Sequence, residues 1–88
     1  MSNDGLSRED VLAKAREHLS SELEVPLDRI DGSTRFREDL DADSLDLYEL
    51  VLELEDTYGV SVSEEEAAKI ETVGQAVDFV VQRLGVGA

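Results

Sequence analysis

The sequence predicts an all-α protein, a small four-helix bundle of three main helices and one short helix with a long first loop. Apolar residues recur at helical three- and four-residue spacing along most of the 88 residues. Capping residues stand where each apolar stripe begins. The alternating stretch Val60-Ser61-Val62 has no partner strand, so we interpret it as an extended connector. A bundle buries such stripes, and this length fits one domain, 1–88, with frayed ends at 1–5 and 85–88.

The first helix is predicted to begin at Ser7. Ser7 with Asp10 forms a capping box, and Leu6 can pack as a hydrophobic staple on Val11. One apolar face then follows at helical spacing: Val11, Leu12, Ala15, Leu19 and Leu23.

A long connection is predicted from about residue 24 to 42, because Pro26 and the cluster Asp31-Gly32-Ser33 interrupt the helical pattern. Five apolar residues along it predict a loop packed over the core rather than a plain linker: Val25, Leu27, Ile30, Phe36 and Leu40.

The second helix is predicted to begin at Asp43 or Ser44 and to end near Tyr58, before the helix-stopping Gly59. Its length is roughly 22 Å at about 1.5 Å per residue. One apolar stripe suits a core: Leu47, Leu50, Val51, Leu54 and Tyr58. A second stripe lies partly outside the first: Leu45, Tyr48 and Leu52. The polar face is acidic: Glu49, Glu53, Glu55 and Asp56.

Two further capping boxes predict the remaining helices. Ser63 with Glu66 opens a short helix that runs to about Lys69, and Thr72 with Gln75 opens the last helix. The apolar face of the last helix is Val73, Ala76, Val77, Val80, Val81 and Leu84.

The negative charge is concentrated in one block. The chain carries a net charge of −14, and residues 38–66 hold twelve acidic residues and no basic one. Such a field repels nucleic acid and anionic membranes, and it attracts basic protein surfaces. The alternative is a solvated helix face that only keeps the protein in solution.

Several classes of protein are excluded by composition. The chain has no cysteine, so no disulfide or thiolate metal site supports the fold. Its longest apolar runs are a few residues, far short of a membrane span. The first residues, Met-Ser-Asn-Asp-Gly, are polar and lack the pattern of a signal peptide, so we expect a cytoplasmic protein.

Ser44 stands among four aspartates, Asp39, Asp41, Asp43 and Asp46, and this context argues against nucleophilic catalysis. The neighbouring carboxylates disfavour an alkoxide. No G-x-S-x-G turn surrounds the serine, and His18, the single histidine, fits a helix surface or boundary better than a triad. We therefore expect no catalytic residue and no enzyme.

A calcium loop is the second chemical possibility. Asp39, Asp41 and Asp43 match positions one, three and five of an EF-hand loop. The match fails at Ser44, where the turn needs glycine, and at Leu50, where a bidentate glutamate is needed. Weak binding of divalent cations is compatible with the cluster, but we expect no dedicated metal site.

Two roles for Ser44 remain open from physical chemistry alone. Serine is a favoured N-cap, worth about 1 kcal/mol. If Asp43 caps the helix instead, Ser44 occupies the first helical turn with its hydroxyl free. It is then a handle that another enzyme can modify, and a phosphate there would lie near the positive end of the helix dipole.

The segment Asp-Ala-Asp-Ser-Leu-Asp at 41–46, followed by Glu49-Leu50-Val51, resembles the acyl carrier protein family. Phe36-x-x-Asp39-Leu40 is similar to the segment that precedes it in the family. Residues 64–70 and Thr72-Val73 resemble the family's third helix and the start of its fourth. The likeness spans roughly residues 6–84.

This resemblance implies that Ser44 carries 4′-phosphopantetheine, which a holo-synthase transfers from coenzyme A. The thiol of the arm would hold acyl groups as thioesters for fatty acid biosynthesis. The alternative is a polyketide or other specialised pathway, including an aminoacyl or peptidyl carrier. Asp41 stands where many members have glycine, and Leu47 and Tyr48 are bulkier than in some, so the subfamily stays open.

The resemblance also implies partners. These are the holo-synthase, ketosynthase, acyltransferase and reductase, which would bind a monomeric carrier through basic patches. The positions implied in recognition are Asp43, Leu45, Asp46, Glu49, Leu52, Glu55 and Asp56. For Leu45 and Leu52 a wider core face is the alternative. A contrasting hypothesis is an acidic adaptor in which Ser44 is only a cap.

An apolar acyl chain would gain from shelter, since water exposure costs about 0.8 kcal/mol per methylene. We expect that shelter between the second helix and the elements after it. The residues are Leu50, Leu54, Val62, Ala67, Ile70 and Ala76.

Overall fold

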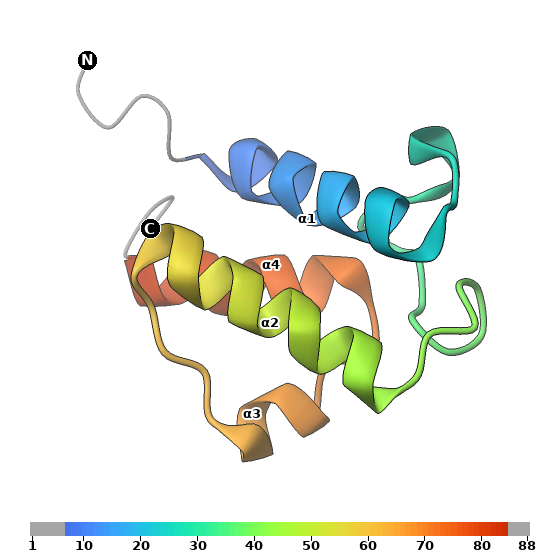
Figure 1. Ribbon diagram of the computed structural model, residues 1–88. Coiled ribbons are helices and arrows are strands. Elements are labelled where there is room, and N and C mark those ends of the chain that lie inside the picture. Colours follow the sequence, from blue (N-terminus) through green and yellow to red (C-terminus); the bar gives the residue numbers. More distant parts are fainter. Residues whose placement is uncertain (1–6, 85–88) are drawn as a thin grey trace.

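The computed structural model describes residues 7–84 and confirms the all-α fold. It contains helices α1 (Arg8–Leu23), α2 (Ser44–Tyr58), α3 (Glu64–Ala68) and α4 (Val73–Leu84), with a single 3-10 turn, η1 (Leu27–Arg29). Helices α1, α2 and α4 pack against one another, and the short α3 contacts α2 (Figure 1). The predicted frayed ends and the Leu6 staple lie outside the described residues.

The three predicted capping boxes form, and Asp43 with Asp46 forms a fourth at the start of α2. The pairs Ser7–Asp10, Asp43–Asp46 and Ser63–Glu66 each exchange reciprocal side-chain and backbone hydrogen bonds. Thr72 and Gln75 do the same, at 3.1 Å in both directions. Since each box satisfies N–H groups that the first turn leaves without partners, these residues determine where the helices begin.

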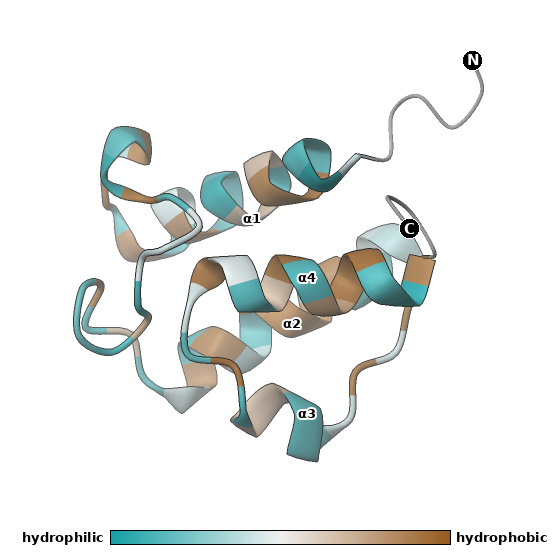
Figure 2. Cartoon of the chain, turned by 180° about the vertical axis from the view of Figure 1, so that it is seen from behind, coloured by the Kyte–Doolittle hydropathy of each residue, from teal (hydrophilic) through white to brown (hydrophobic). Residues whose placement is uncertain are grey.

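The core lies where the predicted stripes of the three long helices meet (Figure 2). Leu19 of α1, Leu50 and Leu54 of α2, and Val73 and Val77 of α4 are almost completely buried. The second stripe of α2 faces outward, as described below. Gly59 ends α2 in the left-handed conformation, as its position predicts.

The long loop packs over the core as predicted, with two differences. Ile30 and Phe36 are buried anchors, and Val25 and Leu40 are partly buried. The prediction that Leu27 also anchors the loop is wrong, because its side chain is 45% exposed. Leu27 belongs to η1, which the sequence did not predict, and the Leu27 carbonyl accepts a hydrogen bond from Arg16 Nη2 at 2.7 Å. Leu27 therefore holds the loop to α1 through its backbone.

The second half of the loop is fastened to the start of α4 by backbone hydrogen bonds. Gly74 N–H donates to the Gly32 carbonyl at 2.8 Å, and Val73 N–H donates to the Thr34 carbonyl at 2.9 Å. Phe36 N–H donates to the carbonyl of residue 71 at 3.0 Å. These bonds fix the path of the chain as it approaches Ser44.

Candidate functional site

Ser44 is the first residue of α2, and its side chain is exposed. Asp43 is the N-cap: its Oδ1 accepts from Asp46 N–H at 3.0 Å, and Asp43 N–H donates to Asp46 Oδ2 at 3.1 Å. The hydroxyl of Ser44 is therefore not used for capping. Its oxygen accepts a hydrogen bond from Arg37 Nη2 at 3.0 Å.

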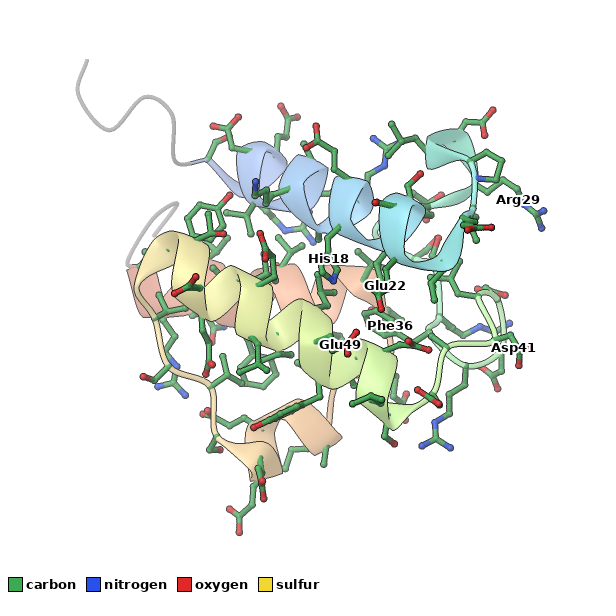
Figure 3. The ribbon with its side chains drawn as sticks, in the orientation of Figure 1. His18, Glu22, Arg29, Phe36, Asp41 and Glu49 are labelled. Atoms are coloured by element: carbon green, nitrogen blue, oxygen red, sulfur yellow. The ribbon has the colours of Figure 1, made fainter. Side chains whose placement is uncertain are left out.

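The loop between Phe36 and Ser44 is a tight reversal. Ala42 N–H donates to the Phe36 carbonyl at 2.8 Å, and Asp41 N–H donates to the Arg37 carbonyl at 3.1 Å. Asp41 lies at the exposed tip with φ +56° (Figure 3). Aspartate tolerates this left-handed conformation better than most residues, and glycine adopts it freely. The turn accounts physically for an interchange of Asp and Gly at this position.

A pocket of about 940 Å³ opens beside Ser44, between the start of α2, the loop and α3. Its walls include apolar side chains from all three segments: Phe36, Ala42, Leu45, Leu47, Tyr48, Ala67, Ala68 and Ile70. Charged residues also line it: Arg35, Arg37, Glu38, Asp43, Glu64 and Glu71. Pockets of this size, mostly apolar with a few polar groups, are typical of ligand sites.

The carboxylates around Ser44 are held in their ionised form. The hydrogen bond from Asp46 N–H lowers the pKa of Asp43, and the hydrogen bond from Arg35 N–H lowers the pKa of Asp39. Each carboxylate accepts from a backbone donor, which favours the charged form. The charge that disfavours an alkoxide on Ser44 is thus present at neutral pH.

The structure forms neither of the two alternatives considered for the sequence, a catalytic triad with His18 or a calcium loop. His18 is half-buried on α1, and the side-chain partner of Ser44 is Arg37. Asp39 accepts from Arg35 N–H at 2.8 Å, whereas Asp43 caps α2. Neither aspartate shares an ion-binding loop with the other.

A different acidic group forms between α1 and α2. Carboxylate oxygens of Glu22, Asp46 and Glu49 lie within 4.8 Å of one another. Figure 3 shows Glu22 and Glu49 pointing toward each other across the two helices. The hydrogen bond and repulsion from Glu22 raise the pKa of Glu49 above its ordinary value. The predicted recognition residue Glu49 therefore belongs to a pair of carboxylates that repel when both are ionised.

The residues expected in partner recognition differ in side-chain exposure and in whether they hydrogen-bond within the fold. Leu45 and Leu52 are 61% and 45% exposed, so the wider core face is excluded for both. Asp56 is exposed, while Glu55 is half-buried and its carboxylate accepts from Val62 N–H at 2.6 Å. Asp43 and Asp46 cap α2, as described above. Several of these acids thus support the fold as well as contributing to the surface charge.

The six residues expected to shelter an acyl chain fall into two groups. Ala67 and Ile70 line the pocket beside Ser44. Leu50, Leu54 and Ala76 are buried in the core, and Val62 packs against it; none of these four is among the lining residues. The sequence did not predict the contributions of Phe36, Leu47 or Ala68, nor that of Arg37. For Arg37, its place directly before the acidic block was the available signal.

Comparison with known proteins shows the family. The family model for the phosphopantetheine attachment site matches residues 13–80. An acyl carrier protein of Rubrobacter xylanophilus is 47% identical over 77 residues, covering 88% of this chain and 95% of the relative. Another from Lactobacillus acidophilus is 41% identical over 80 residues, covering 91% of this chain and all of the relative.

Solved structures show the same likeness. An acyl carrier protein from Enterococcus faecalis superposes with a TM-score of 0.75 at 42% identity, covering 89% of this chain and 99% of that one. One from Thermotoga maritima has a TM-score of 0.77 at 32% identity, covering 89% and 91%.

The fold and the site therefore define a phosphopantetheine-binding carrier domain. The chain belongs to the acyl carrier protein family. Members of this family carry acyl groups for acyl-processing enzymes and are not themselves enzymes. None of the helices formed by residues 7–84 has the length and apolar composition that crossing a bilayer requires.

Proposed function

We propose that Ser44 is the residue to which 4′-phosphopantetheine is attached. One observation carries this proposal: Ser44 starts α2 with an exposed hydroxyl, while the neighbouring Asp43 does the capping. The site fits the group, because the pocket begins at Ser44 and an arginine lies at its hydroxyl. When bound, the group supplies the thiol that this cysteine-free chain lacks.

The test is loading by a phosphopantetheinyl transferase with coenzyme A, followed by intact-mass measurement. Wild type should gain one arm, and Ser44→Ala should gain none. Ser61→Ala is the matched control, because Ser61 is an exposed serine in the connector before α3, and it should load fully. Ser44→Ala should lose about 1 kcal/mol at most, since it removes one exposed hydrogen bond and no cap. An arm on the Ser44→Ala protein would sink the assignment, whereas a wild-type chain that stays unmodified would favour the adaptor hypothesis.

We further propose that the carrier serves fatty acid biosynthesis. The support is the apolar wall beside Ser44, formed by Leu45 and Leu47 of α2 and Ala67 and Ile70 at α3. Such a wall suits an alkyl chain, whose transfer from water is worth about 0.8 kcal/mol per buried CH₂. Polyketide, aminoacyl and peptidyl cargoes carry polar groups, which gain less from an apolar wall than an alkyl chain does.

Octanoyl loading provides the test. The octanoyl form of wild type should melt at a higher temperature than the form that carries the arm alone. Ala67→Leu should fold and accept the arm, but it should lose most of that gain because the larger side chain occupies the pocket. Ala13→Leu makes the same change at an exposed position of α1 and should keep the gain. Equal stabilisation of all three proteins, or of none, would favour the specialised-pathway alternative.

Partners are proposed to bind α2 through its exposed apolar residues Leu45, Tyr48 and Leu52 within the acidic block. Apolar contacts would supply affinity, while the charge would speed the encounter with basic patches on the holo-synthase, ketosynthase, acyltransferase and reductase. Leu45→Ser should weaken loading by the holo-synthase with little effect on stability, because the side chain is 61% exposed. Unchanged loading kinetics for this variant would remove Leu45 from the proposed interface.

A further inference from the structure

Arg37 differs from the other arginine of its loop in what it contacts. Arg35 forms ion pairs with Glu38 at 3.0 Å and Asp39 at 3.5 Å. Within residues 7–84, the Arg37 side chain has no acidic partner within ion-pair distance, and its one side-chain hydrogen bond is to Ser44 Oγ. Although it borders a block of twelve acids, its guanidinium is directed at a neutral hydroxyl.

The backbone of the loop holds Arg37 in this place. Its carbonyl accepts from Asp41 N–H, and the carbonyl of Phe36, which is buried, accepts from Ala42 N–H. These bonds reverse the chain, so that residues seven positions apart face each other. The folded loop, anchored by Phe36, therefore places the backbone of Arg37 where its side chain can reach the Ser44 hydroxyl.

We propose that Arg37 is a positioning residue that binds the phosphodiester through which the arm is joined to Ser44. This inference rests on the proposed function of Ser44. When coenzyme A donates the arm, the Oγ–P bond forms, the pyrophosphate bond of coenzyme A breaks, adenosine 3′,5′-bisphosphate leaves and the hydroxyl proton is released. The two non-bridging oxygens on that phosphorus share one negative charge and lie close to the guanidinium that already contacts Oγ. Guanidinium groups bind phosphate oxygens with paired N–H donors, more strongly than they bind a neutral hydroxyl.

The negative charge around Ser44 explains why a cation would be needed at the phosphodiester. A phosphodiester adds a negative charge beside Asp43 and Glu38, which line the same pocket and repel it. The start of α2 offers a partial positive charge, and Arg37, which also lines the pocket, adds a full one. With the phosphodiester held by Arg37, the root of the arm would be directed along the pocket wall instead of turning freely in solvent.

The experiment compares the loaded forms of wild type, Arg37→Gln, Arg37→Lys and Arg29→Gln. Arg29 is the matched control: it is exposed on η1, where Figure 3 shows it pointing outward, and it does not line the pocket. Intact mass first establishes that each protein carries the arm. The ³¹P resonance of the phosphodiester is then followed from 10 mM to 1 M NaCl, over which the screening length falls from about 30 Å to about 3 Å.

In wild type and Arg29→Gln the ³¹P shift should move as salt weakens the ion pair. In Arg37→Gln this movement should fall by roughly two-fold or more, and Arg37→Lys should retain part of it, because lysine keeps the charge without the paired donors. A second measurement needs no substitution: in wild type, loading should shift the side-chain ¹⁵N–H resonance of Arg37 and leave that of Arg29 unchanged.

The two proposals fail in different ways. If no protein acquires an arm at Ser44, both the attachment site and the role of Arg37 are overturned. If every protein is loaded, but the ³¹P response is the same in Arg37→Gln as in wild type and the Arg37 resonance does not move, the attachment site stands and the role of Arg37 is overturned.

Discussion

Replacing Gly74 by alanine should destabilise this protein, although the same change within an exposed helix normally stabilises by about 1 kcal/mol. Gly74 is the second residue of α4 and is buried. A Cβ at this position would lie 2.7 Å from the Gly32 carbonyl oxygen and 3.3 Å from Arg8 Nη2. The arginine end can move aside, but the carbonyl belongs to the backbone of the docked loop.

The expected loss of stability in Gly74→Ala follows from the displacement of the Gly32 carbonyl. The Gly32 carbonyl accepts from Gly74 N–H at 2.8 Å, so moving it away from a new methyl also lengthens that bond. Overpacking of this kind costs about 1–3 kcal/mol, and a weakened hydrogen bond costs about 1 kcal/mol. After subtraction of the helix-propensity gain of about 1 kcal/mol, the expected net loss is about 1–3 kcal/mol. For a domain of this size each kcal/mol lowers Tm by roughly 4–8 °C.

Thermal and urea unfolding followed by circular dichroism would measure this loss. Gly32→Ala is the matched control, because a Cβ there would meet only Gly74 Cα at 3.9 Å, an ordinary contact. That variant should stay within about 0.5 kcal/mol of wild type, as unstrained substitutions do. A Gly74→Ala protein as stable as wild type, or more stable, would refute the argument that the loop is held rigidly against α4.

Three further predictions concern strain and charge. Glu24 ends α1 in the left-handed region, with φ +57°. Glu24→Gly should therefore raise the free energy of unfolding, measured by urea titration, by up to about 1 kcal/mol. Asp41→Gly should raise it less, because aspartate tolerates the left-handed region better than glutamate does. Because the pKa of Glu49 is raised, folding favours its protonated form. The stability that this protonation contributes is fully present below the pKa of glutamate in the unfolded chain, about 4.3. It is lost as the pH rises through the pKa of Glu49 in the folded protein. Glu22→Gln should therefore raise Tm more at pH 7 than at pH 4, and an equal rise at both would contradict the pairing. Finally, NaCl or millimolar Mg²⁺ should raise the wild-type Tm by screening the twelve acids of residues 38–66, whereas a melting curve indifferent to both would show that their repulsion is negligible.

Much of this protein could be predicted from sequence because its determinants are local. A capping box joins residues three apart, so pairs such as Asp43 and Asp46 are visible without any knowledge of the fold. The apolar stripe of α2 and the acidic block around Ser44 are likewise properties of neighbouring residues. Helical periodicity likewise separates Leu45 and Leu52 from the first stripe, but it left a wider core face as an alternative, which their exposure in the structure excludes.

Only the tertiary structure decided which distant groups meet. Nothing in the spacing indicates that Gly32 touches Gly74, that the carboxylates of Glu22 and Glu49 meet, or that Arg37 reaches Ser44. The acyl pocket shows the same limit: composition pointed to aliphatic residues near α3, but three of the six are buried in the common core and Val62 packs against it, so these four are not part of the pocket wall. These contacts depend on how the loop crosses the bundle, which is set by long-range packing and backbone hydrogen bonds, and the local pattern does not encode that path.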